Sequence, residues 1–204
     1  MKGLLIKEWE TSKAIFKWYA LIAAVLFVIG AVMGNEGFFL GIGIFVSVSY
    51  PAVSIAYDDK DKWFKFALAS GCSPRKLAWS KFVIPVSACF VLSCLSAVAM
   101  TFIQDKDLPW EEIPIMFAIM LVMLSVMIPL YIKFGAEHGR VVVVIIMLVA
   151  MIGADAFFGS FTNLESIGAS AAGIALSWLS PIAGTAVVAG SAELTARIIR
   201  SKEY

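Results

Sequence analysis

The sequence has few of the residues that usually carry catalytic or metal chemistry. Its 204 residues include one histidine and three cysteines, and no two cysteines have the C-x-x-C spacing of a metal or redox site. No G-x-x-x-x-G-K-[ST] stretch occurs, so a phosphate-binding loop of that kind is absent. The net charge of +1 gives no bulk attraction to nucleic acid. We therefore expect neither an enzyme nor a nucleic-acid-binding protein, and no cofactor or metal in this chain.

Apolar residues are abundant instead. They make up 61% of the chain, against about 45–50% in soluble domains, and the mean hydropathy is +0.90. Six apolar runs can each cross a hydrocarbon core of about 30 Å as a helix. They span residues 18–33, 38–57, 82–102, 113–132, 141–158 and 167–190. The runs are continuous rather than alternating, which favours helices over barrel strands. The sequence thus predicts an all-α, polytopic membrane protein with one transmembrane domain over residues 1–204.

The basic residues predict the orientation. All 16 lysines and arginines except Lys106 lie in four segments, which are residues 1–17, 58–81, 133–140 and 197–202. Basic residues near span ends are enriched on the cytoplasmic side. The distribution therefore predicts that both termini are cytoplasmic and that segment 58–81 is a cytoplasmic loop.

Segment 58–81 combines charge with aromatic residues. Asp58 or Asp59 can cap a helix start, and Gly71 is a plausible helix stop. Ser73 before Pro74 is typical of the start of a second helix. The pattern predicts a short amphipathic helix, a turn, and a helix that continues into the third span.

Two interpretations of the short helix are open. Trp63, Phe66 and Ala67 share one face by their spacing, with Phe64 and Leu68 beside them. Such a face can lie in the headgroup zone of anionic lipid. Alternatively, it can dock into a groove on a soluble partner.

The leader "MKGLLIKEW", the two following spans and the stretch "DDKDKWFKFALASGCSPRKLAWSKF" resemble the permease subunits of type-2 ABC exporters, the bacterial ABC-2 type membrane protein family. The resemblance implies that loop 58–81 contains the coupling helix, which sits in a cleft of a separate ATPase subunit. It assigns the docking contact to Trp63, Phe64, Phe66 and Leu68, and the charged rim of that contact to Lys60, Asp61, Lys62 and Lys65. It also implies that residues 1–17 form an amphipathic elbow helix with Leu4, Leu5, Trp9 and Phe16.

The same resemblance implies the partners. ATP and Mg²⁺ are expected in the ATPase subunit, and a second permease, identical or related, is expected to complete the translocation path. The expected location is the bacterial plasma membrane, in contact with lipid. The apolar spans and short outer connections favour an amphipathic or hydrophobic cargo, such as a peptide, an antimicrobial or a lipid-like molecule.

Two features are candidates for the translocation path. Asp155 is a carboxylate within an apolar run, which is costly in a membrane and often functional. The alternative is that it reaches water at the outer end of its helix. Met116, Met120, Met123 and Met127 form a stripe that suits varied apolar shapes, although such stripes also serve packing. Two other functions stay open: an ion-coupled secondary transporter that uses Asp155, and a membrane scaffold that recruits a cytosolic partner.

Overall fold

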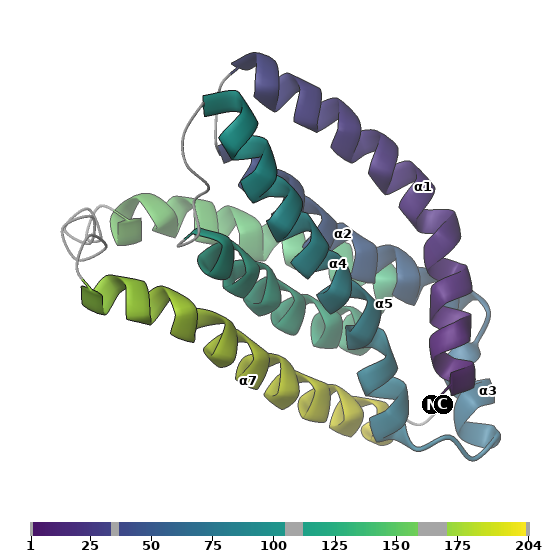
Figure 1. The fold of residues 1–204 in the computed structure, drawn as a ribbon. Helices are drawn as coiled ribbons and strands as arrows, with labels where there is room; N and C mark the ends of the chain where they lie inside the picture. Colours follow the sequence, from purple (N-terminus) through teal and green to yellow (C-terminus); the bar gives the residue numbers. More distant parts are fainter. Residues whose placement is uncertain (1, 34–36, 105–111, 159–170, 203–204) are drawn as a thin grey trace.

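The computed structural model describes residues 2–33, 37–104, 112–158 and 171–202, and within these ranges it contains helices and no strand (Figure 1). The all-α prediction is confirmed for this part of the chain. The helices are α1 (Lys2–Met33), α2 (Gly37–Lys60), α3 (Trp63–Ala69), α4 (Pro74–Gln104), α5 (Glu112–Phe158) and α7 (Ala171–Ser201).

Helix α1 joins the predicted leader helix and the first predicted span. Its two parts, Lys2–Lys13 and Ile15–Gly30, meet at a bend of 47°. The buried side of α1 recurs every three or four residues, as expected for a helix that packs along one face. It carries Leu4, Glu8, Ser12, Ile15 and Tyr19. Two of these five residues are polar, so the first part of α1 does not bury a purely apolar stripe.

The main core lies between α2, α4, α5 and α7, with α1 along the side of α2 and α4 (Figure 1). Helix α5 contributes more apolar residues to this core than any other helix. They include Met120, Leu121, Leu124 and Ile128, which are all at most 1% exposed. Helix α7 approaches α5 closely at Gly184. A Cβ there would lie 3.1 Å from Leu121 Cδ1, so the missing side chain lets the two helices pack tightly.

Helix α5 contains a break at Gly135, whose φ of 78° and ψ of 165° are not helical. This backbone conformation is accessible to glycine without steric cost. The break separates the predicted spans 113–132 and 141–158, so a single residue replaces the connection expected there. Lys202 Nζ donates to the Ile132 carbonyl at 2.6 Å, just before the break. The end of α7 is thereby tied to the middle of α5.

Three helical segments within the described ranges are long and apolar enough to cross a membrane: Pro74–Val98, Ile113–Gly135 and Ser177–Ser201. The bent α1 makes a fourth if its two parts count as one span. The prediction of six spans therefore stays a prediction.

Several helix ends meet at one end of the bundle. The start of α1, the end of α2, α3, the start of α4 and the end of α7 lie together there (Figure 1). Arg75 Nε and Glu193 Oε2, from α4 and α7, are 2.8 Å apart, and Lys7 of α1 pairs with Asp58 of α2. We call this region the α3 end. It gathers basic residues that are far apart in the sequence, while the side of the membrane it faces stays a prediction.

Candidate functional site

Helix α3 begins differently from the sequence prediction. Helix α2 continues to Lys60, so Asp58 lies in its last turn and caps no helix. The residue before α3 is Lys62, with a φ of 51° and no side-chain cap bond. A left-handed conformation is uncommon outside glycine. The expectation that Asp58 or Asp59 caps this helix is wrong, because the chain reverses through Lys62 instead.

The other end of α3 matches the prediction. Gly71 has a φ of 79°. Its N–H donates to the Leu68 carbonyl, and the Cys72 N–H donates to the Ala67 carbonyl, both at 3.0 Å. This pair of bonds is the Schellman motif, which satisfies the last carbonyls of a helix. Helix α4 then begins at Pro74, as predicted.

The aromatic residues of α3 do not share one outward face. Phe64 and Ala67 are each 2% exposed and belong to the main core. Trp63 and Leu68 are half-buried against that core, whereas Phe66 is 63% exposed. The rim residues Lys60, Asp61, Lys62 and Lys65 are all exposed. Docking by this helix stays a prediction, but in this structure Phe64 is directed inward and Phe66 is the accessible aromatic.

Beside α3 lies a groove of about 420 Å³, whose lining includes Leu4 of α1 and Trp63, Phe66 and Lys76. The indole Nε1 of Trp63 is buried and has no hydrogen-bond partner among the described residues. A buried donor without an acceptor costs about 1–3 kcal/mol. Trp63 therefore lines the groove with an enclosed, unpaired N–H, beside the exposed ring of Phe66.

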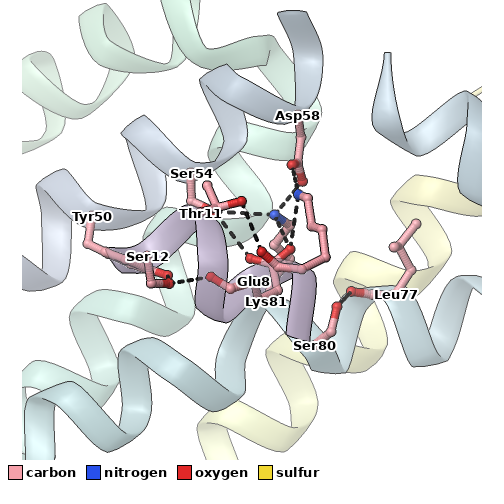
Figure 2. Close-up of polar contacts among 10 residues, drawn as sticks. Glu8, Thr11, Ser12, Tyr50, Ser54, Asp58, Leu77, Ser80 and Lys81 are labelled. Carbon is pink, nitrogen blue, oxygen red and sulfur yellow. Dashed lines mark hydrogen bonds and ion pairs between the residues drawn. The ribbon is translucent and has the colours of Figure 1, made fainter. Parts of the chain in front are cut away.

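Under α3, four charged side chains form a cluster that joins three helices (Figure 2). We call Lys7, Glu8, Asp58 and Lys81 the ion cluster. Lys81 Nζ lies 2.7 Å from Glu8 Oε1 and also pairs with Asp58. Lys7 pairs with Asp58 and lies 3.3 Å from Glu8 Oε1. Ser54 accepts a hydrogen bond from Lys81 at 3.2 Å and donates one to Glu8 Oε2 at 3.4 Å.

The ion cluster is almost fully enclosed. The side chains of Glu8, Asp58 and Lys81 are at most 3% exposed, and that of Lys7 is 23% exposed. Two positive and two negative groups balance, so burial leaves no uncompensated charge. Removing one partner from such a buried set costs about 3–5 kcal/mol. The cluster therefore fixes the start of α1, the end of α2 and the start of α4 relative to one another.

Both aromatic rings on the inner side of α3 contact this cluster. Lys7 Nζ lies 5.0 Å from the centre of the Trp63 ring, and Lys81 Nζ lies 6.0 Å from that of Phe64. Cation–π contacts of this kind are worth about 0.5–2 kcal/mol. The inner side of α3 thus contacts charged side chains of both α1 and α4.

The ion cluster was not predicted from the sequence, although two local signals point to it. Glu8 and Ser12 lie on the same helical stripe as Leu4 and Ile15, so two polar groups occupy a face that is otherwise apolar. Lys81 likewise interrupts a buried stripe that contains Ala78 and Phe82. A polar residue on an apolar stripe predicts a buried partner, but the identity of that partner cannot be read locally.

The candidate path residues are placed as follows. Met116, Met120 and Met127 are buried within the bundle, at 6%, 0% and 1% exposure, and Met123 is half-buried. Met120 packs where Gly43 of α2 leaves room, since a Cβ on Gly43 would lie 1.8 Å from its Cε. In this structure these methionines serve packing, and their role in transport stays a prediction. The side chain of Asp155 lies outside the described residues.

The fold and this site define a helical integral membrane protein in which the short helix α3 packs against the main core and a buried ion cluster. The family model described as "ABC-2 family transporter protein" matches residues 3–198 of the 204. The chain belongs to this family of ABC transporter membrane proteins, which confirms the resemblance drawn from its leader and first loop. No curated protein and no solved structure matches the chain.

Proposed function

We propose that this chain is the permease subunit of an ABC exporter and that α3 is its coupling helix. A separate ATPase subunit binds at the α3 end and supplies the ATP and Mg²⁺ chemistry, so the permease itself is not catalytic. The observation that carries the proposal is that α3 presents Phe66 outward while its inner side rests on the ion cluster.

The exposed side of α3 suits a protein groove. An exposed aromatic ring surrounded by lysines resembles the anchor-and-rim arrangement of binding interfaces. The groove next to Phe66 adds part of the half-buried Trp63 ring to the surface that a partner can contact. The exposed lysines at positions 60, 62 and 65 favour an acidic border on the ATPase cleft.

Coupling then proceeds through the ion cluster. When the ATPase subunits close on ATP, they move the docked α3. Because Trp63 and Phe64 contact Lys7 and Lys81, this movement reaches the helices that carry those lysines. The start of α1 and the start of α4 shift together, since the buried charges resist separation. A second copy or a related permease completes the path in the plasma membrane, and an amphipathic or hydrophobic molecule is the cargo.

Co-purification tests this proposal. The chain is expressed from its native locus with an affinity tag, extracted in mild detergent, and its partners are identified by mass spectrometry. We expect an ABC ATPase in the complex. We expect Phe66→Ala to reduce its recovery at least tenfold, because an interface anchor contributes about 2 kcal/mol or more.

The matched control is Phe90→Ala on α4, which removes a similarly exposed ring far from α3 in sequence and should leave ATPase recovery unchanged. Equal recovery with Phe66→Ala and wild type contradicts the docking assignment. Ion-dependent transport by the purified chain alone indicates a secondary transporter, and a stable complex that moves no cargo indicates a scaffold.

A further inference from the structure

A long apolar groove runs between α1, α2 and α4, away from the α3 groove and outside the main core. Its volume is about 790 Å³, and it is lined by 17 residues that are nearly all apolar. Small residues on α1 keep it open, among them Ala20, Ala23 and Ala24. Val46 of α2 and Leu92 of α4 lie in its other walls. A volume of this size is within the range of about 300–1,000 Å³ found for small-molecule sites.

The groove is suited to a chain of methylene groups rather than to a polar ligand. Of its two α4 serines, Ser87 already donates to the Ile84 carbonyl at 2.7 Å. Ser96 likewise has an interaction of its own. Beyond the bend of α1, the lining follows this helix from Phe16 to Val28, about 18 Å at 1.5 Å per residue. This length is a little more than half of the hydrocarbon thickness of about 30 Å, so the groove matches the acyl chain of a lipid in one leaflet.

The surface on either side of the groove is also apolar. Leu21 and Val25 on α1 are 60% and 53% exposed, and Phe90 and Leu95 on α4 are 55% and 56% exposed. In a membrane protein such side chains face lipid tails. The groove therefore opens toward the bilayer, where acyl chains are the abundant apolar molecules.

One end of the groove carries positive charge. Lys13 and Lys17 are exposed, and they lie four residues apart on the side of α1 that also carries Trp9 and Ala20. Lys13 pairs with Glu10 at 2.6 Å, whereas Lys17 makes no ion pair with the described residues. A tryptophan and a free lysine at the end of an apolar span are typical of the headgroup level of a membrane.

We propose that this groove binds an anionic phospholipid, with an acyl chain against Ala20 and Ala24 and the phosphate near Lys17. The lipid fills the space between α1 and the pair α2 and α4. It requires neither the ATPase subunit nor transport, so it is independent of the coupling proposal.

Native mass spectrometry of the purified chain in mild detergent tests this site, with phosphatidylglycerol and phosphatidylcholine as the probes. Wild type should retain one phosphatidylglycerol in preference to phosphatidylcholine. Ala24→Trp fills the groove and should reduce that binding at least tenfold, and Ala20→Phe should act in the same direction. Val25→Trp adds the same bulk on the neighbouring exposed face, and should bind as wild type does.

The headgroup contact has its own variant. Lys17→Glu should reduce the preference for phosphatidylglycerol at least fivefold, because each basic group near a membrane surface contributes about fivefold. Arg197→Glu changes the charge equally at the end of α7 and should have no effect. Wild-type lipid binding by Ala24→Trp, or an unchanged preference in Lys17→Glu, overturns the proposal. A third result would also overturn the proposal. If Ala24→Trp keeps its bound lipid but no longer forms a dimer that wild type forms, the groove is occupied by a second copy of the chain and not by lipid.

Discussion

Lys81→Met should be strongly destabilising, by about 3–5 kcal/mol, although methionine is well tolerated in an apolar span. The substitution leaves Glu8 and Asp58 with Lys7 as their only basic partner in the ion cluster. Because the side chains of Glu8 and Asp58 are at most 3% exposed, one carboxylate then stays buried without a compensating charge. The melting temperature of the purified protein in detergent, followed by fluorescence-detected size exclusion, measures the loss.

Two further variants separate charge balance from other effects of Lys81→Met. Lys76→Met makes the same change five residues earlier on α4, at an exposed position, and should melt as wild type does. The double variant Glu8→Gln/Lys81→Met restores neutrality and should recover most of the lost stability. If the double variant melts no higher than Lys81→Met, the cluster is not held by balanced charge.

Phe64→Ala should destabilise the permease and Phe66→Ala should not, although the two residues are only two positions apart. Phe64 is 2% exposed, so its removal leaves a cavity between α3 and the bundle that costs about 3–5 kcal/mol. Phe66 is 63% exposed, and its removal should leave the stability of the permease unchanged. Phe64→Ala should therefore lower the melting temperature and speed proteolysis within residues 58–74.

The pair also separates docking from coupling. In the Phe64→Ala variant, Phe66 is still present for the ATPase to bind, so some complex should form. Cargo-stimulated ATP hydrolysis should be lost, because α3 no longer packs firmly against the bundle. With Phe66→Ala, the complex itself is lost. An equal loss of stability in both variants contradicts the inward and outward assignment of these rings.

Local patterns predicted much of the fold. The helices follow from continuous apolar runs, and the turn after α3 follows from Gly71 and Pro74, whose backbone preferences act within a few residues. The gathering of basic residues at the α3 end was anticipated from their distribution along the sequence. These features depend on short stretches of chain, which is why they could be predicted without a structure.

The features that could not be predicted depend on distant partners. Glu8 and Lys81 are separated by more than 70 positions, and neither residue alone indicates that they meet. The inward direction of Phe64 depends on how α3 packs against the bundle. The spacing of the aromatic residues in α3 is compatible with either face of this helix being buried. The break at Gly135 was missed because a glycine between two apolar runs is equally typical of a loop.

The most direct test of the central claim is photo-crosslinking from position 66 in intact membranes. A photoreactive amino acid replaces Phe66, and the adduct is identified by mass spectrometry, with the same replacement at Phe90 as reference. The account predicts one main adduct between position 66 and an ABC ATPase that contains a phosphate-binding loop. It predicts no adduct between position 90 and this ATPase. An adduct with lipid only, or labelling of position 66 by a membrane-impermeant reagent from outside the cell, would contradict it.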